Sequence, residues 1–322
     1  MRPEPATTGH RPTTGTSPLQ PPTAAPRAGV AGMEFTKQFL RAKNPCANGF
    51  RWFSRHVQDG SGYQEALDTL VQAGRVDDAC WLLTQFGPTQ EVLTLDALGA
   101  DAIVFAGTLE VRGNIEADTV VHVGGDIRAS GGLRAGGAVT AGGDIRVAGS
   151  LQVRGALQAG GGVRADWGVD VEGDTRCGGD LRAGWDAVCG GRLQLQGGAF
   201  IGQDLIVHGA AECSKGLRVG GHLTGRESLR AGQGILVGGG ISGVVHLEAG
   251  WGIKAGESIH ALGAIKAGET LSAGHAICAG TGYGVFAGLS VQEEAWTASG
   301  QVWAAERPTG LRSGVWMGPS PL

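Results

Sequence analysis

The chain has 322 residues, and glycine supplies 60 of them, nearly a fifth of the total, against about 7 % in ordinary globular proteins. Proline numbers only 12 and no G-X-Y period runs along the chain, which excludes collagen. Apolar residues make up 42 % and charged residues 17 %, so the composition favours a buried core over a glycine-rich disordered chain. The formal net charge of −4 gives no sign of nucleic-acid binding, and no such partner is expected.

Targeting and redox signals are also missing from the sequence. No apolar run reaches the roughly 18 residues of a transmembrane helix, and the N-terminus has no apolar region of the secretory kind. The six cysteines form no CxxC pair, which argues against a zinc site and against a disulfide framework. We therefore expect a cytoplasmic protein in a reducing environment.

The first segment, residues 1–33, is rich in proline and threonine and has almost no large apolar side chains. Such a segment cannot bury enough apolar surface to offset the entropy of ordering it, so we predict a disordered tail. Met33 directly precedes sequence of a different character. It is therefore a candidate start of translation beside Met1.

Residues 34–92 are predicted to form a small α-helical head, of about four short helices, that acts as a cap. Apolar residues recur there at helical spacing, as in the stripe of Leu67, Leu70 and Val71. Gly74 stands where a helix would end, which predicts a pair of helices joined by a tight turn.

A six-residue repeat runs without insertion from about Ile103 to Val291. Each hexad opens on a large aliphatic residue, places a smaller apolar residue two positions later, and often carries glycine two positions after that. Alternating apolar and polar residues indicate a short strand, and glycine at a fixed offset indicates a corner. The openers include the following residues: Leu109, Ile115, Val121, Ile127, Leu133, Val139, Ile145, Leu151, Leu157, Val163, Val169, Ile253, Ile259, Ile265, Leu271, Ile277 and Leu289.

The predicted fold is mainly β: a three-sided β-solenoid with 18 residues per coil and about ten coils, behind the helical head. We expect the solenoid to span residues 93–291 and a C-terminal tail or cap to span 292–322. Open strand edges at both ends of such a stack must be capped or used for association.

The 18-residue period brings like residues into columns. Four arginines then share one column, which is the candidate interaction surface: Arg128, Arg146, Arg164 and Arg182. Arg218 and Lys254 resume it further along, and a parallel column of Asp126, Asp144 and Asp180 lies one position before the openers. These charges suit two hypotheses, a solvated ladder of ion pairs or a docking stripe for phosphate or an acidic surface.

Two tryptophans, Trp167 and Trp185, also coincide at a corner and are the candidate aromatic contact. Stacking of the two rings along the solenoid is the alternative. The histidines share no column, and no catalytic, cofactor-binding or metal-ligating residues are expected. Cys177, Cys189 and Cys213 occupy inward positions as small apolar filler, Cys278 should point outward, and Cys46 should pack within the head.

The uninterrupted [LIV]-x-[AVI]-x-G-x hexads of residues 103–291, together with the proline-rich N-terminal tail, resemble those of the bactofilins, polymer-forming bacterial cytoskeletal proteins. The resemblance implies a right-handed β-helix that self-associates end to end into filaments without nucleotide. The helical head is not part of that family's plan, and as a cap it would block one end.

Two other functions stay open. The chain could be a monomeric scaffold that docks an acidic protein or a membrane surface on its arginine column. It could instead be a hexapeptide-repeat acyltransferase, although those enzymes place a small residue two positions before the aliphatic one and extrude a loop that builds the acceptor site. Here the position two before the aliphatic residue is mostly glycine, and no loop interrupts the hexads.

Overall fold

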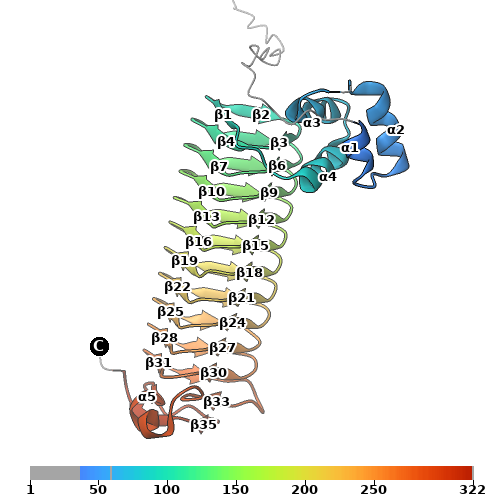
Figure 1. The fold of residues 1–322 in the computed structure, drawn as a ribbon. Coiled ribbons are helices and arrows are strands. Elements are labelled where there is room, and N and C mark those ends of the chain that lie inside the picture. Colours follow the sequence, from blue (N-terminus) through green and yellow to red (C-terminus); the bar gives the residue numbers. More distant parts are fainter. Residues whose placement is uncertain (1–36, 59, 321–322) are drawn as a thin grey trace, which may run out of the picture. The chain divides into compact units, whose positions relative to one another are not determined.

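The structure is a computed structural model and describes residues 37–58 and 60–320. The predicted disordered tail at 1–33, with both candidate translation starts, lies outside the described residues. Three parallel β-sheets form a solenoid, preceded by a small helical region (Figure 1). This confirms the predicted fold class.

The first sheet has 13 strands and carries the arginine column. Its order along the solenoid is β1 (Val92–Leu95), β4 (Thr108–Val111), β7 (Ile127–Ala129), β10 (Ile145–Val147), β13 (Val163–Ala165), β16 (Leu181–Ala183), β19 (Ala199–Ile201), β22 (Leu217–Val219), β25 (Ile235–Val237), β28 (Ile253–Ala255), β31 (Leu271–Ala273), β34 (Gln301–Trp303) and β36 (Val315–Gly318).

The second sheet has 11 strands and ends earliest along the chain. Its order is β2 (Leu98–Ala100), β5 (Ile115–Ala117), β8 (Leu133–Ala135), β11 (Leu151–Val153), β14 (Val169–Val171), β17 (Ala187–Cys189), β20 (Leu205–Val207), β23 (Leu223–Gly225), β26 (Ile241–Ser242), β29 (Ile259–His260) and β32 (Ile277–Cys278).

The third sheet has 12 strands, and helices α3 (Tyr63–Gln72) and α4 (Val76–Phe86) contact its first strand. Its order is β3 (Ile103–Phe105), β6 (Val121–Val123), β9 (Val139–Ala141), β12 (Leu157–Ala159), β15 (Thr175–Cys177), β18 (Leu193–Leu195), β21 (Ala211–Cys213), β24 (Leu229–Ala231), β27 (Leu247–Ala249), β30 (Ile265–Ala267), β33 (Val285–Phe286) and β35 (Leu311–Ser313).

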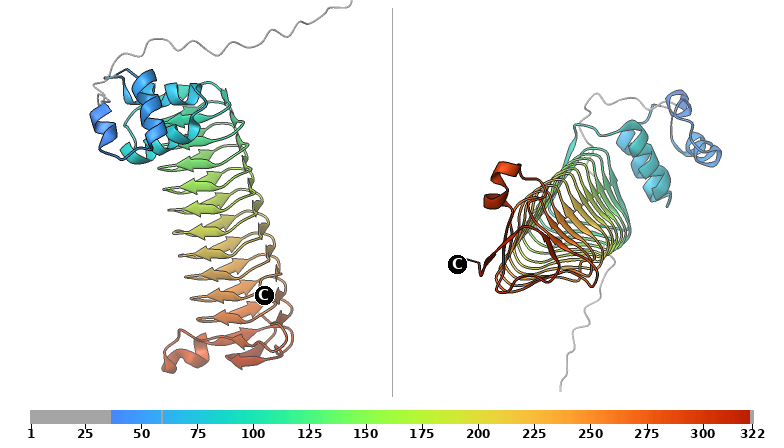
Figure 2. Two further views of the ribbon diagram at one scale, coloured as in Figure 1. Left: turned by 90° about the vertical axis from the view of Figure 1, so that its right-hand side faces the viewer. Right: turned by 90° about the horizontal axis from the view of Figure 1, so that it is seen from below.

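The three sheets stack into one continuous column of coils, seen end-on in Figure 2 (right). The inward side chains of all three sheets form the core. In β10, Ile145 and Val147 are buried while Arg146 between them is exposed, and nearly every strand repeats this alternation. In the regular coils each residue pairs with its equivalent 18 positions away, as Ile145 pairs with both Ile127 and Val163. The hexad pattern therefore predicts which residues the core contains.

The corners are tight because the backbone of one coil lies directly on the next. Gly161 donates its N–H to the carbonyl of Gly143, one coil earlier, at 3.0 Å. A Cβ at Gly155, which holds the glycine position of its hexad, would come within 2.7 Å of the backbone carbonyl carbon of Gly137, one coil earlier. Corner glycines thus allow close stacking rather than flexibility.

The solenoid is longer than the ten coils expected, and its two ends depart from the hexad rule. At the start, Leu93, Leu98 and Ile103 succeed one another at five-residue spacing, so a coil is added before the regular repeat. At the other end, two extra residues precede Val285, and Leu289 is 52 % exposed instead of opening a strand. The expectation of an uninterrupted repeat to Val291 was therefore wrong.

Residues after 291 partly continue the solenoid. The 3-10 helix η1 (Glu293–Ala295) and helix α5 (Trp296–Ser299) form a short excursion. Strands β34 and β36 then extend the first sheet, and β35 extends the third. The register shifts where β35 pairs with β33 and where β36 pairs with β34. This segment combines irregular extra strands with a short helical insert.

The helical region comprises α1 (Lys37–Arg41), α2 (Ala47–His56), α3 (Tyr63–Gln72) and α4 (Val76–Phe86). Gly74 has φ of +70° and ends α3, as predicted. Its N–H bonds the carbonyl of Val71, and the Arg75 N–H bonds that of Leu70, which is the pair of bonds of a Schellman cap. Leu67 and Leu82 are fully buried between α3 and α4.

The helices pack on the first strand of the third sheet. Val104 of β3 and Ala106 after it join the buried cluster of the helical region. The Gln64 side-chain amide donates to the Val104 carbonyl at 3.0 Å and accepts the Ala106 N–H at 2.8 Å. These groups point away from β6, because Ile103 and Phe105 make the bonds to that coil. Gln64 therefore caps the edge of β3, while β1 and β2 remain edge strands of their own sheets.

We predict that core and surface positions of one hexad differ sharply in stability. Leu157→Ala should lower the free energy of unfolding by about 2–5 kcal/mol, because Leu157 is fully buried and the coil cannot collapse around the cavity. Gln158→Ala, on the exposed side of the same strand, should change it by less than about 0.5 kcal/mol. Urea denaturation of both variants measures the difference, and equal effects would contradict the inward register.

Candidate functional site

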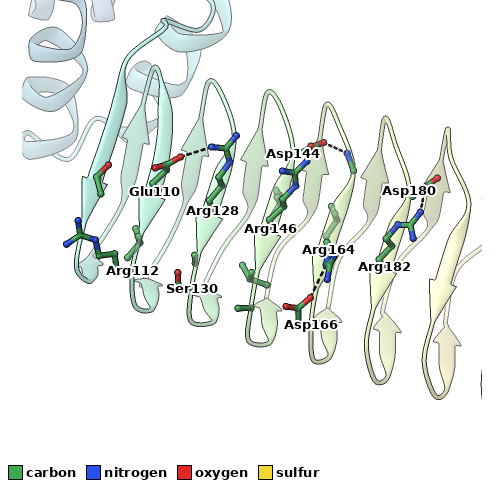
Figure 3. Close-up of a pocket in the computed structure, with 18 residues that line it drawn as sticks. Glu110, Arg112, Arg128, Ser130, Asp144, Arg146, Arg164, Asp166, Asp180 and Arg182 are labelled. Carbon is green, nitrogen blue, oxygen red and sulfur yellow. Dashed lines mark hydrogen bonds and ion pairs between the residues drawn. The ribbon is translucent and has the colours of Figure 1, made fainter.

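The four arginines of the predicted column do lie in register on the outer side of the first sheet. Arg128, Arg146, Arg164 and Arg182 are successive partners in β7, β10, β13 and β16. With neighbouring coils about 4.8 Å apart, their guanidinium groups would repel strongly if nothing neutralised them. They line a broad hollow of about 960 Å³ (Figure 3).

Each of these four arginines has a carboxylate partner. Arg146 bonds Asp144 at 2.7 Å and Arg182 bonds Asp180 at 2.8 Å, each two positions earlier in the chain. Arg128 bonds Asp126 at 2.8 Å in the same way and Glu110 of the preceding coil at 2.6 Å. The structure therefore has the geometry of an ion-pair ladder in this stretch.

Arg164 is the exception that shows how the ladder depends on one position. Gly162 stands where the coils of the other three arginines have an aspartate, so no carboxylate lies two positions earlier. Arg164 turns the other way along its strand and bonds Asp166, two positions later, at 2.9 Å (Figure 3). Arg164 thus still has an ion-pair partner, on the other side of it in the chain.

The aspartates of the ladder also hold the corners together. Asp144 Oδ1 accepts the N–H of Gly162, one coil on, at 2.8 Å, while its Oδ2 binds Arg146. Asp180 Oδ1 accepts the N–H of Gly198 at 2.9 Å in the same way. This backbone bond holds the pKa of Asp180 below its usual value, and the hydrogen bond from Arg182 adds a smaller effect in the same direction. Sequence reasoning found the column but missed this second bond.

The same bond to the next coil recurs at other corners with other residues. Asn114 accepts the Gly132 N–H at 3.0 Å. His222 and His246 accept the N–H of Gly240 and Ala264 through Nδ1 at 3.0 and 3.1 Å. A polar residue one position before the opener is the signal that could have predicted it.

Beyond Arg182 the character of the column changes. The next partners in register are Phe200, Arg218, Leu236 and Lys254, in β19, β22, β25 and β28. The Arg182 guanidinium lies over the Phe200 ring, 4.4 Å from its centroid. The predicted resumption at Arg218 and Lys254 is confirmed in register, but apolar side chains alternate with these cations.

Trp167 and Trp185 stack on each other at their corner, which was the predicted alternative to a protein contact. Their ring centroids are 6.4 Å apart with the planes inclined by 21°, and both side chains are more than 60 % exposed. Nothing in the described residues covers the pair. Its use as a protein contact stays a prediction.

The cysteines of the solenoid behave as expected, and one in the head does not. Cys177, Cys189 and Cys213 are buried, and burial raises the pKa of their thiols to about 12, 11 and 12. Cys278 is exposed. Cys46 was expected to pack in the head, but it is exposed at the start of α2, where its Sγ accepts the Gly49 N–H at 3.2 Å.

Within residues 37–58 and 60–320, no group of three or more His, Cys, Asp or Glu side chains is arranged to hold a metal ion. In the same part of the chain no helix is long and apolar enough to cross a membrane.

Comparison with known proteins touches only the helical region. Residues 33–86 match the family model of the YdhT N-terminal domain, a stretch that contains α1 to α4. No curated protein and no solved structure matches the chain. The helical region is therefore similar to that domain, and the similarity does not extend to the solenoid.

We predict that the aspartates matter more for stability than the arginines they bind. Asp144→Ala should cost about 1–3 kcal/mol, since it leaves the half-buried Gly162 N–H without an acceptor. Arg146→Gln should cost less than about 1 kcal/mol, the usual range for an exposed ion pair. Thermal unfolding of the two variants tests this, and a larger loss from Arg146→Gln would contradict the assignment.

A thiol-labelling experiment checks the inward register independently. In the folded protein at pH 8, a maleimide should label Cys278 and Cys46 quickly, because both are exposed. Cys177, Cys189 and Cys213 should react only after denaturation, since their thiols are buried and almost fully protonated. Mass spectrometry of digested protein locates the labels. Rapid labelling of Cys189 in the native state would count against this register.

Proposed function

We propose that this protein is a non-catalytic structural protein that self-associates end to end through its β-solenoid, as the bactofilins do. The observation that carries the proposal is that its parallel sheets finish in edge strands at both ends. Strands β1 and β2 begin two of the sheets, and β32, β35 and β36 end all three. Such edges carry backbone groups ready to pair with another chain.

Side chains at the first coil favour the same proposal. Leu93, Leu95 and Leu98 pack against the core but are only partly buried, whereas their equivalents in the next coil, such as Leu109, are fully buried. A second chain stacked on this coil would complete their burial. Burial of that area is the main driving force available for association.

The position of the helical region bears on whether this end is blocked. Gln64 occupies the edge of β3, but the helices contact the solenoid mainly at that one strand. Within residues 37–58 and 60–320, two of the three edges in the first coil therefore retain their backbone groups for pairing. We propose that the helices limit how a second chain can approach and leave association possible.

Catalysis is not part of the proposal. From β4 to β32, consecutive strands are joined by only three or four residues, so no loop projects to build an acceptor site of the acyltransferase kind. We also place the protein in the cytoplasm. Three free thiols in its core suit a reducing compartment.

Sedimentation and negative-stain imaging of the full chain without nucleotide test self-association. We expect assemblies larger than a monomer that grow with protein concentration. Thr94→Pro in β1 should weaken them, because Glu91 and Leu95 make the bonds to the next coil and Thr94 faces the open edge. Met317→Glu in β36 tests the opposite end. A chain that remains monomeric at all concentrations overturns the proposal.

A further inference from the structure

Among the residues that the structure describes, the cations in the arginine column of the first sheet are paired with carboxylates before Phe200, and those after Phe200 are not. Aspartate stands two positions before Arg128, Arg146 and Arg182, but glycine takes that place before Arg218 and Lys254, at Gly216 and Gly252. Within the described part of the chain, neither Arg218 nor Lys254 forms an ion pair. Both side chains are exposed.

Exposed apolar side chains surround these two cations. Phe200 and Leu236 alternate with them along the column and are 39 % and 40 % exposed, and Trp251 at the neighbouring corner is 51 % exposed. Together these residues line a hollow of about 530 Å³ on the first sheet. We call this surface, formed by Phe200, Arg218, Leu236, Trp251 and Lys254, the apolar–basic groove. Its composition matches a ligand that combines negative charge with an apolar surface.

The spacing of the groove selects the shape of that ligand. Arg218 and Lys254 are two coils apart, about 9.6 Å at the usual strand spacing, with Leu236 between them. Residues seven apart on an α-helix share a face and lie about 10.5 Å apart, with the third and fourth residues between them on the same face. An extended peptide repeats a face every 6.7 Å or so, which does not match.

We propose that the apolar–basic groove binds an acidic amphipathic helix of a partner protein. Two acidic residues seven apart on the helix would pair with Arg218 and Lys254. Leucine-like residues between them would pack on Leu236 and against Phe200 and Trp251. This surface lies on the side of the solenoid, so the proposal is independent of association through the ends.

The test uses the full chain and a labelled synthetic helical peptide with two glutamates seven apart and leucines at the third and fourth positions between them. Fluorescence anisotropy at low ionic strength should show binding. Arg218→Gln and Lys254→Gln should each weaken it up to about fivefold, the range of an exposed charge pair. Trp251→Ser should weaken it about tenfold or more, as expected for an aromatic anchor.

Arg146→Gln is the matched control, because Arg146 lies in the same column but is already paired with Asp144. It should leave peptide binding unchanged. A peptide of equal composition with its glutamates five apart should bind at least about fivefold less tightly, since its charges fall on different faces. Circular dichroism of each variant confirms that the fold is retained.

Three results would overturn the proposal. The first is no binding of the peptide, or equal binding of both peptides. The second is an equal loss of binding in Arg146→Gln and Arg218→Gln. The third is Arg218-dependent co-sedimentation with phosphatidylglycerol vesicles without peptide binding, which would assign the groove to anionic lipid instead.

Discussion

The whole solenoid depends on one constraint: in the regular coils, each residue pairs with and stacks on the residue 18 positions away. The ladder that joins Ile127, Ile145 and Val163 applies equally to the exposed arginines between those core positions. Whatever side chain a position carries is therefore brought within about 4.8 Å of its counterpart. For aliphatic side chains this builds a continuous core, and for charged side chains it creates repulsion that the sequence has to relieve.

The corner aspartates show how that relief is combined with stability. One carboxylate oxygen of Asp144 accepts a backbone N–H from the next coil, and the other binds the arginine of its own coil. A surface ion pair alone contributes little. A bond to a half-buried backbone group contributes more, because losing it leaves that group unsatisfied. The aspartates therefore contribute to stability mainly through their backbone bonds, and neutralising the arginines is the smaller contribution.

Much of this could be predicted from the sequence because the repeat is strict. The hexad spacing indicated the inward positions, and coincidences at 18 residues indicated the three sheets and the alignment of Arg128 with Arg182, since all depend on period alone. Single local events were not predictable. Arg164 turns toward Asp166 because of one glycine, and Gln64 reaches β3 across 40 residues of sequence. No periodic signal encodes either contact.

The ends of the solenoid were also beyond the reach of periodicity. The first coil closes with five-residue spacing, and the last coils contain extra residues and register shifts. Such changes are compatible with strands that have a neighbour on one side only, because a strand between two coils has its register fixed from both. The predicted number of ten coils was too low, because only coils with the regular hexad spacing could be identified in the sequence.

The same stacking constraint gives meaning to the uneven distribution of aspartate along the first sheet. If neutralising stacked cations were the sole requirement, Arg218 and Lys254 would need aspartates as Arg146 does. They are instead separated by Leu236, which moves the two cations to twice the coil spacing and lowers their repulsion without a carboxylate. That solution leaves two positive charges available beside exposed apolar side chains. A ladder built only for stability has no need of such a surface, whereas one that binds an acidic partner does.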